Sequence, residues 1–449
     1  MITSLLIANR GEIAGRVIRT AKRLGVRTVA IATDPDLDLP YARKADEVVE
    51  LGAPAPATSY LDADRLLAIA VDHAVDAIHP GYGFLSENAN FAQVVGDAGI
   101  IWVGPTPDAM RAMGNKATAR ALMAKAGVAV AAGSIEPVLD VGAALEVAHE
   151  IGYPVMVKAT AGGGGIGMSA ARDDDELRAA FTTARARAER FFSDPGVLIE
   201  RFIERARHLE VQILGLTDGQ IVAVGVRDCS VQRRHQKVIE ESPPANVTPA
   251  LLERLTSMAV NAGEAVSYRN AGTVESLYDN DRDEIVFLEM NTRLQVEHPV
   301  TEMVTGLDLV EEQLRIASGL APTFDPREPI KTYGHAIELR VYAEDSVSFL
   351  PRPGTITEWV MPAGPDVRVD AGYAVGNTVT AFYDPLLAKV VVWGADRDEA
   401  RHRAQIAADG IAVTGPQCNV SFLVAALADP EFAAGTYDTG VVSRILTRG

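Results

Sequence analysis

Polar side chains of several chemical types recur at every second position over residues 289–297. They are Glu289, Asn291, Arg293, Gln295 and Glu297. In an extended segment these side chains would share one face and leave the other largely apolar. Alternation alone also describes an ordinary surface strand. The residue types favour chemistry instead, because carboxylate and amide oxygens suit Mg2+, a guanidinium fork fits a small planar oxyanion, and a neighbouring carboxylate can act as a base.

A further carboxylate, Glu275, lies on the strand expected immediately upstream. The flanking segments predict a hairpin whose five-residue turn pairs Tyr278 with Glu284. In that register Glu275 faces Phe287 and lies diagonal to Glu289 on one face. Two carboxylates at close range repel each other and usually need a cation. The hairpin therefore predicts a site for a divalent metal ion.

Five of the six residues at 162–167 are glycine. Without Cβ atoms in the way, several backbone N–H groups can converge on phosphate oxygens. The run nearly matches a P-loop, but Met168 stands where the P-loop lysine must be, and the segment joins two expected strands. A flap over a nucleotide and a plain hairpin explain the run equally well. Lys158, at the end of the preceding strand, favours the nucleotide because its ammonium can act on the phosphates as a point charge.

Basic and polar side chains also gather between residues 208 and 237. They are His208, Gln232, Arg233, Arg234, His235 and Lys237. Together they could line a phosphate channel, although a solvated charged turn is the more common role for any one of them. A lone histidine such as His208 is more often structural than a ligand. Arg340 has Glu338 and Glu344 as candidate ion-pair partners nearby in the sequence.

Strands and helices alternate over the first hundred residues. An apolar strand at 4–8 precedes a helix whose apolar side chains recur at helical spacing and end at Gly25, and a second strand follows at 27–32. This alternation predicts a parallel, doubly wound sheet. The first strand-to-helix turn, at 9–12, lacks G-x-G-x-x-G, which disfavours a dinucleotide site.

The pattern changes after a boundary at Pro105-Thr-Pro107, where antiparallel-looking strands become frequent. We therefore expect an α/β unit followed by α+β units. The division is an N-terminal domain at 1–114, a central domain at 115–330 with a mobile lid at about 131–203, and a C-terminal domain at 331–449.

The net charge of −18 argues against a nucleic-acid partner, because phosphate binding depends on a basic surface. The two cysteines, Cys229 and Cys418, have no paired metal-ligand spacing, so neither a disulfide framework nor a zinc site is expected. No window approaches the roughly 18 apolar residues of a membrane span, and the start does not resemble a signal peptide. These features predict a cytoplasmic enzyme without a membrane partner.

Several of these motifs together resemble the biotin carboxylases, which are ATP-grasp ligases. The resemblance rests on NRGEIA at 9–14, HPGYGFLSEN at 79–88, the glycine run, QRRHQK at 232–237 and EMNTRLQVEHPVTE at 289–302. The last stretch is very specific, and the resemblance extends from residue 4 to about 446. It implies the ATP-grasp fold with a glycine-loop lid.

The resemblance also implies a role for each matching position. ATP would contact Lys116, Lys158, Gly164, Gly165 and His208, the adenine side would be formed by Glu200, Arg201, Phe202 and Ile203, the apolar walls by Met168 and Leu277, and the rest of the pocket by Gln232 and His235. Magnesium or manganese, in two sites, would be held by Glu275, Glu289 and Asn291. Bicarbonate would be held by Lys237, Arg293, Gln295 and the backbone of Val296, with Glu297 as the general base and Arg340 facing the biotin ureido oxygen.

The implied reaction is the first half-reaction of an acyl-CoA carboxylase such as acetyl-CoA carboxylase, an enzyme of fatty acid biosynthesis. Glu297 deprotonates bicarbonate, which attacks the γ-phosphate of ATP to give carboxyphosphate, and the carboxyl group then passes to biotin. The implied partners are a biotin carboxyl carrier, a second copy of the chain and a carboxyltransferase subunit. The alternatives are another bicarbonate-activating ATP-grasp ligase and a catalytically silent nucleotide-binding subunit.

Two departures from the family pattern bear on this reading. Ile166 and Ser169 stand where family loops often carry basic residues, which puts ATP affinity in doubt more than reaction type. No Met-Lys-Met, the usual site of biotin attachment, occurs in the sequence. Biotin is therefore expected on a separate chain or on a domain outside this sequence.

Overall fold

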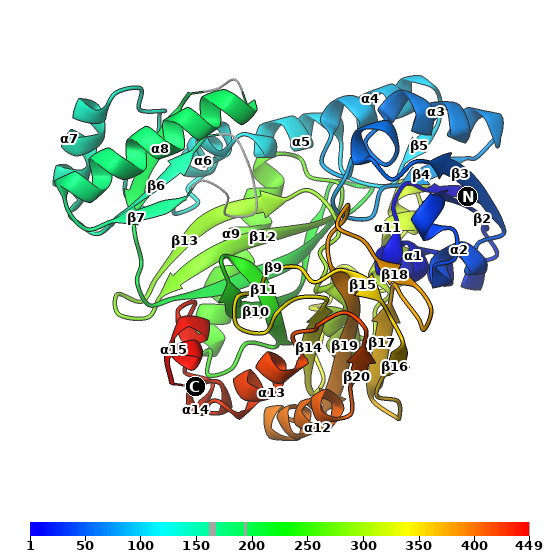
Figure 1. Ribbon diagram of the computed structural model, residues 1–449. Coiled ribbons are helices and arrows are strands. Elements are labelled where there is room, and N and C mark those ends of the chain that lie inside the picture. Colours follow the sequence, from blue (N-terminus) through cyan, green and yellow to red (C-terminus); the bar gives the residue numbers. More distant parts are fainter. Residues whose placement is uncertain (161–167, 193–194, 449) are drawn as a thin grey trace.

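The computed structural model describes residues 1–160, 168–192 and 195–448. Figure 1 shows a parallel-sheet unit at the N-terminus, a large central sheet, a small unit carrying α7 and α8, and helices α12–α15 near the C-terminus. The predicted Gly164, Gly165 and Ile166 lie outside the described residues.

The N-terminal unit is a parallel sheet in the order β3-β2-β1-β4-β5. Successive β1 side chains pack on opposite faces: Leu5 and Ile7 belong to the core that contains α1, and Leu6 belongs to the core that contains α3 and α4. The predicted doubly wound sheet is therefore confirmed. Its elements are β1 (Ser4–Ile7), α1 (Gly11–Arg23), β2 (Arg27–Thr33), α2 (Pro40–Lys44), β3 (Glu47–Gly52), α3 (Ala63–Asp72), β4 (Ala77–His79), α4 (Ala89–Asp97) and β5 (Ile101–Trp102).

The centre of the molecule is an eight-stranded antiparallel sheet in the order β13-β12-β9-β10-β11-β14-β19-β17. Strands from before and after residue 331 thus share one sheet through the β11–β14 pairing. These strands are β9 (Ala206–Gly215), β10 (Ile221–Arg233), β11 (Gln236–Ser242), β12 (Asn270–Asp279), β13 (Glu284–Asn291), β14 (His335–Tyr342), β17 (Val367–Ala371) and β19 (Leu386–Gly394). Helices of the central region are α5 (Pro107–Gly114), α6 (Lys116–Lys125), α9 (Pro249–Ala265), α10 (His298–Thr305) and α11 (Leu309–Ala317).

A smaller sheet, β7-β6-β8, packs against α7 and α8 around a hydrophobic core of its own. It lies at the upper left of Figure 1, apart from the parallel sheet. Strands β6 and β7 are antiparallel neighbours, as expected for two strands that the glycine run joins. The elements are α7 (Val141–Ile151), β6 (Val155–Ala159), β7 (Ser169–Ala171), α8 (Asp174–Phe192) and β8 (Val197–Arg201).

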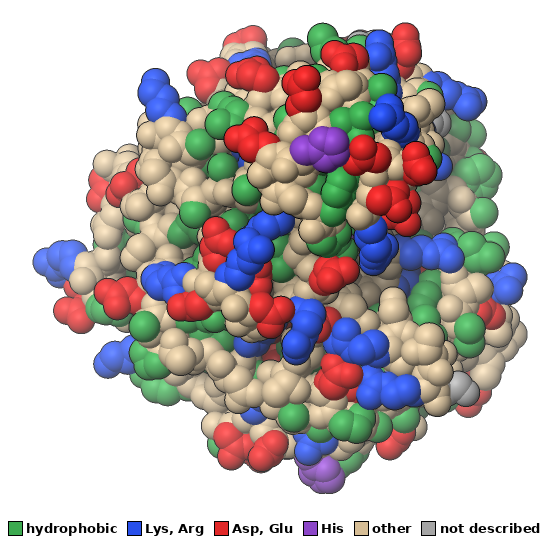
Figure 2. Space-filling model, turned by 90° about the vertical axis from the view of Figure 1, so that its left-hand side faces the viewer, with side chains coloured by type: hydrophobic (Ala, Val, Ile, Leu, Met, Phe, Trp, Pro, Cys, Tyr) green, Lys and Arg blue, Asp and Glu red, His purple; other side chains and the backbone are tan. Residues whose placement is uncertain are grey.

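The C-terminal third adds short strands and helices around the end of the large sheet. They are β15 (Gly354–Thr355), β16 (Glu358–Val360), β18 (Thr378–Val379), α12 (Arg397–Asp409), β20 (Ala412–Thr414), α13 (Val420–Ala428), α14 (Pro430–Ala434) and α15 (Val441–Arg448). On the face in Figure 2, acidic and basic side chains intermingle. Among the described residues, no helix has the length and apolar character needed to span a bilayer.

Candidate active site

The described residues predicted to act on substrates all line one cavity of about 1230 Å³. They are Lys116, Lys158, Met168, Glu200, Arg201, Phe202, Ile203, His208, Gln232, His235, Lys237, Glu275, Leu277, Glu289, Asn291, Arg293, Gln295, Val296, Glu297 and Arg340. The cavity also takes lining residues from the N-terminal unit, including Glu12 and Tyr82. Segments hundreds of residues apart thus converge on a space large enough for a nucleotide and a second small molecule.

The β12–β13 hairpin brings two carboxylates together through a register that differs from the predicted one. Asp279 pairs with Glu284, so the turn has four residues and the predicted Tyr278–Glu284 pairing is wrong. A β-bulge then places one extra residue, Leu288, on β13, and Glu275 pairs directly with Glu289. The one-residue slip would have separated the two carboxylates, and the bulge compensates for it.

The predicted polar strand ends earlier than its sequence pattern indicates. Strand β13 stops at Asn291, and Glu297 is the N-cap residue of α10. The continuous extended segment to 297 is therefore wrong, because the chain turns into a helix whose Pro299 suits its first turn. The turn still gathers the side chains: Asn291 Nδ2 and Gln295 Nε2 each donate to Glu275 Oε1 at 2.8 Å.

Arg293 lies between the central region and the N-terminal unit. Its guanidinium donates to Asn291 Oδ1 at 2.8 Å and to Glu87 Oε2 at 3.1 Å. Glu87 belongs to the HPGYGFLSEN segment, so two of the motifs that carry the resemblance meet here. The contacts orient the arginine fork at the wall of the cavity, where it can bind an oxyanion.

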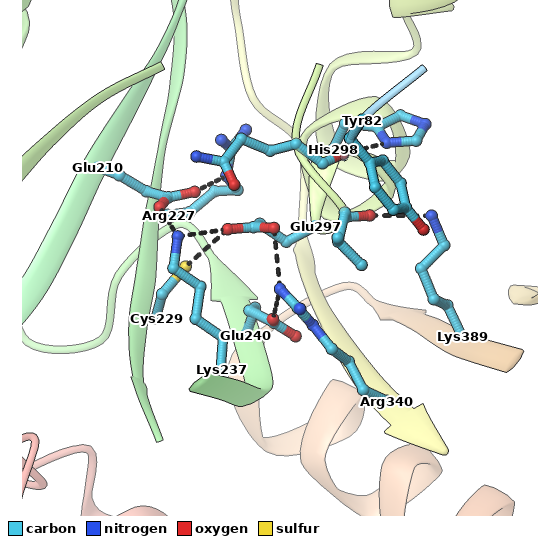
Figure 3. Close-up of polar contacts among 12 residues, drawn as sticks. Tyr82, Glu210, Arg227, Cys229, Lys237, Glu240, Glu297, His298, Arg340 and Lys389 are labelled. Atoms are coloured by element: carbon cyan, nitrogen blue, oxygen red, sulfur yellow. Dashed lines mark hydrogen bonds and ion pairs between the residues drawn. The ribbon is translucent and has the colours of Figure 1, made fainter. Parts of the chain in front are cut away.

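Glu297 is fully buried and lies between two cations (Figure 3). Lys237 Nζ is 2.6 Å from Glu297 Oε1, and Arg340 is 2.9 Å from Glu297 Oε2. Burial by itself would raise the pKa of Glu297, but Lys237, Arg340 and Arg227 hold the pKa well below its ordinary value. The carboxylate of Glu297 is thus kept ionised.

Lys237 is shared among three carboxylates. Its ammonium lies 2.5 Å from Glu210 and 2.8 Å from Glu275 in addition to Glu297. Burial would lower the pKa of Lys237, whereas these three carboxylates raise it well above the ordinary value. We call Glu210, Lys237, Glu240, Glu275, Glu297 and Arg340 the site cluster. An incoming anion would find two cations here that are already fixed in place.

The carboxylate pair fits a divalent cation. Burial, and then the charge of Glu275, raises the pKa of Glu289, which is the expected behaviour of two facing carboxylates. The amide nitrogen of Asn291 donates to Glu275 and its amide oxygen accepts from Arg293, and all three residues of the predicted metal site line the cavity. A tighter group of potential ligands, His208, Glu210 and Glu275, is bridged by Lys237 across its two carboxylates. Glu275 belongs to both groups, and Lys237 contacts it at 2.8 Å.

The other end of the cavity combines apolar walls with a buried ion pair. Ile203 and Leu277 belong to one small hydrophobic cluster, and both line the cavity. Lys158 Nζ lies 2.5 Å from Glu200. Burial by itself would raise the pKa of Glu200, but the charge of Lys158 opposes this rise, and the pKa lies below its ordinary value. Arg201 also lines the cavity, but its guanidinium pairs with Asp279 and Glu284 of the β12–β13 hairpin.

The QRRHQK motif spans the turn between β10 and β11, and its residues differ in burial and in their partners. His235 is exposed and Arg233 is buried against Glu344. Gln232 lies 2.8 Å from His208 Nδ1, whose other ring nitrogen is 2.9 Å from Glu275. His208 therefore links Gln232 to the carboxylate pair.

Sequence reasoning missed three residues next to the predicted ones, Glu210, Glu240 and Cys229, and it gave Arg340 the wrong partners. Arg340 pairs with Glu240 at 2.5 Å and with Glu297, so both of its predicted partners are wrong, since arginine reaches across to β11 rather than along its own strand. Glu210 had a detectable signal, because His208, Glu210 and Gln212 alternate along β9. Cys229 is a buried free cysteine 3.9 Å from Glu297, without such a signal.

The sequence matches three protein families. Residues 1–110 match the biotin carboxylase N-terminal domain, residues 115–322 the ATP-binding domain of the carbamoyl-phosphate synthase L chain, and residues 338–444 the biotin carboxylase C-terminal domain. The biotin carboxylase of Halalkalibacterium halodurans is 48% identical over 99% of this chain and 98% of its own. Biotin carboxylase 2 of Bacillus subtilis is 47% identical over 99% of this chain and 100% of its own.

A solved structure shares the whole fold. It is the biotin carboxylase domain dimer of Hydrogenobacter thermophilus 2-oxoglutarate carboxylase, in complex with MgADP, ADP and bicarbonate. The TM-score is 0.95 at 38% identity, over 99% of both chains. The expected ATP-grasp fold is thus confirmed. The chain belongs to the biotin carboxylase family, ATP-grasp ligases that catalyse the first half-reaction of biotin-dependent carboxylation.

Proposed function

We propose that the cavity binds ATP, a divalent metal ion and bicarbonate together, and that Glu297 is the base that starts the reaction. The observation that carries the proposal is the position of Glu297, which is fully buried between Lys237 and Arg340 at the wall of the cavity. The Hydrogenobacter domain that shares the fold was solved with MgADP and bicarbonate, which supports the same ligands here.

Bicarbonate would bind to Lys237, Arg293, Gln295 and the backbone of Val296. An arriving anion shares the charge of Lys237 with Glu297, which weakens the effect that keeps the pKa of Glu297 low. Glu297 then becomes a better base as its substrate binds, and it takes the bicarbonate proton. The resulting oxygen attacks the γ-phosphorus, ADP leaves, and carboxyphosphate forms.

Magnesium or manganese would be held by Glu275, Glu289 and Asn291, and would neutralise charge on the phosphates. Lys116 and Lys158 would bind the same phosphates, and Ile203 and Leu277 would pack on the adenine. Glu200 to Phe202, His208, Gln232, His235 and Met168 complete the proposed nucleotide pocket. Gly164 and Gly165 are proposed to cover the phosphates as part of a lid at about 131–203, within the central domain at 115–330.

The second step transfers the carboxyl group to biotin. Carboxyphosphate breaks down to CO2 and phosphate, and the phosphate takes the proton from biotin N1. The deprotonated N1 then attacks the carbon of CO2, and the N–C bond of carboxybiotin forms. Arg340 stabilises the enolate-like oxygen that develops on the ureido ring, as an oxyanion hole does. The buried guanidinium of Arg340 lines the cavity and lies 2.9 Å from Glu297. The group that would stabilise the ureido oxygen and the proposed base are therefore next to each other.

The partners remain part of the proposal. A biotin carboxyl carrier, as a separate chain or domain, would bring biotin to the cavity, and a carboxyltransferase of an acyl-CoA carboxylase would use the product. A homodimer is supported by the Hydrogenobacter structure, which is a domain dimer.

The test is an ATP hydrolysis assay on the purified protein with free biotin as acceptor. Release of ADP should require both bicarbonate and Mg2+ and should rise when biotin is added. Manganese should replace magnesium, and EDTA should abolish turnover. ADP release at an equal rate in bicarbonate-free buffer would overturn the proposal.

A further inference from the structure

A buried lysine lies directly behind the turn that carries Val296 and Glu297. Lys389, on β19, is 0% exposed, and its ammonium donates to the carbonyl oxygen of Val296 at 2.9 Å. Its second partner is Glu12 of α1, at 3.1 Å. Figure 3 shows Lys389 on one side of Glu297 and Lys237 on the other. The ammonium therefore contacts the backbone of the site and none of the groups proposed to react.

Glu12 ties the same point to the N-terminal unit. One carboxylate oxygen accepts from the hydroxyl of Tyr82, and the other faces Lys389. Burial raises the pKa of Glu12, while Lys389 opposes that rise. Three parts of the chain, α1, the HPGYGFLSEN segment and β19, thus meet at one carbonyl of the central region.

The neighbouring carbonyl is held in a similar way. His298 is fully buried, and its Nδ1 lies 2.7 Å from the carbonyl oxygen of Gln295. Burial, with Lys389 and Arg16 adding to it, holds the pKa of His298 well below its ordinary value. The ring is therefore neutral, and its Nδ1–H is the donor. Two consecutive carbonyls of the turn each have a buried donor.

The direction of each carbonyl in the turn also fixes the direction of the N–H group that follows it. In a trans peptide the N–H points away from the preceding carbonyl oxygen. The Val296 N–H therefore points away from His298, and the Glu297 N–H points away from Lys389. Because Gln295, Val296 and Glu297 line the cavity, N–H groups that point away from these donors can face the space where bicarbonate is proposed to bind.

Lys389 is a costly residue for an inner strand. Both of its neighbours on β19, Ala388 and Val390, are fully buried. Replacing a buried ion pair by well-packed apolar side chains is often neutral or stabilising, so stability alone gives little reason for a lysine at this place. An ammonium is useful there because it can hold a carbonyl that apolar side chains cannot hold.

We propose that Lys389 and Glu12 are positioning residues that hold the Gln295–Glu297 backbone in the orientation that binds bicarbonate and places Glu297. The inference rests on the proposed function, because it assigns the bicarbonate end of the same cavity. It predicts that loss of the ammonium weakens bicarbonate binding and leaves the nucleotide end, with Lys158 and Glu200, unchanged.

The experiment compares Lys389→Met with the wild type in bicarbonate-dependent ADP release. The KM for bicarbonate should rise about tenfold or more, which is the effect of losing one hydrogen bond to a charged group. The affinity for ADP, measured by calorimetry, should stay within twofold. A merely structural role would lower the melting temperature and the amount of active protein without this split between the two ligands.

Arg397→Met is the matched control. Arg397 also donates to backbone carbonyls, of Phe432 and Ala433, and also pairs with a buried carboxylate, Glu241. It does not line the cavity. Its loss should lower the melting temperature and leave the KM for bicarbonate within twofold of the wild type.

Glu12→Gln is the second variant, and it keeps a partner for Tyr82 while removing the charge that faces Lys389. It should raise the KM for bicarbonate by about threefold to tenfold. An unchanged KM in folded Lys389→Met, or in Glu12→Gln if the methionine variant does not fold, overturns the inference. A wild type without bicarbonate-dependent turnover would instead overturn the proposed function, and the inference with it.

Discussion

Two buried charge clusters contact the same helix, α10, and only one of them lines the cavity. The site cluster meets the helix at its N-cap residue, Glu297. The other joins α1, α10 and β17, and we call it the interdomain cluster. Its members are Arg16, Glu302, Asp308, Arg368 and Asp370.

The clusters differ in how their charges are shared. In the interdomain cluster Arg16 and Arg368 each pair with two carboxylates, that of Glu302 and that of one aspartate. Asp308 also caps α11 by accepting from two backbone N–H groups. In the site cluster the single ammonium of Lys237 contacts three carboxylates, Glu210, Glu275 and Glu297. Burial and sharing of charge are thus common to both clusters, and a cation shared among three carboxylates beside a cavity distinguishes the site cluster.

The largest difference between the two clusters is expected at Glu297. We expect Glu297→Gln to lower bicarbonate-dependent ADP release by about a hundredfold to ten-thousandfold, because glutamine fills the same space but cannot accept the proton. ADP binding and the melting temperature should change little, since Lys237 and Arg340 keep other carboxylate partners. Turnover above a tenth of the wild-type rate would remove Glu297 as the base.

The opposite result is expected for Arg16→Met. The substitution leaves Glu302 with one arginine and Asp308 without its nearest one, which costs about 3 kcal/mol of stability. Thermal unfolding should show a midpoint lowered by several degrees. The KM for bicarbonate of the folded enzyme should stay within twofold, and a tenfold rise would show that the two clusters are coupled.

A smaller effect, on the pH dependence of stability, is expected from the two buried carboxyl groups near Arg340. Glu240 and Glu338 are fully buried and pair directly across β11 and β14. Burial raises the pKa of Glu240 to about 7. The charge of Arg340 opposes this rise, and the charge of Glu297 adds to it. Burial and Glu240 also raise the pKa of Glu338. At least one of the two carboxyls is therefore protonated near neutral pH.

These raised pKa values fix the sign of the pH dependence. An unfolded glutamate ionises near pH 4.3, so the folded wild type loses stability as pH rises from that value toward the folded pKa. Glu338→Gln removes one such group and lets Glu240 ionise more easily. The variant should gain about 1–2 kcal/mol over the wild type between pH 5 and pH 8. Melting temperatures at the two pH values check this, and an equal difference at both would contradict it.

Local patterns in the sequence were enough for the elements and for much of the site. The apolar spacing of residues 4–32 predicted the parallel sheet because core-facing side chains must recur at the period of their own element. The types of Glu275, Glu289 and Arg293 predicted a cation next to an oxyanion site. The family resemblance, through long motifs such as EMNTRLQVEHPVTE, led to the fold and the activity that the comparisons support.

Only the tertiary structure decided how these residues meet. The bulge at Leu288 aligned Glu275 with Glu289, and the turn after Asn291 replaced the expected strand. The partners of Arg340 and the place of Lys389 came from segments far away in the chain. Residue types and local periods are written in neighbouring positions, so the sequence determined which chemical groups the protein has. Register and long-range pairing depend on the packing of whole segments against one another, so the fold alone determined which groups share a proton, a cation or a carbonyl.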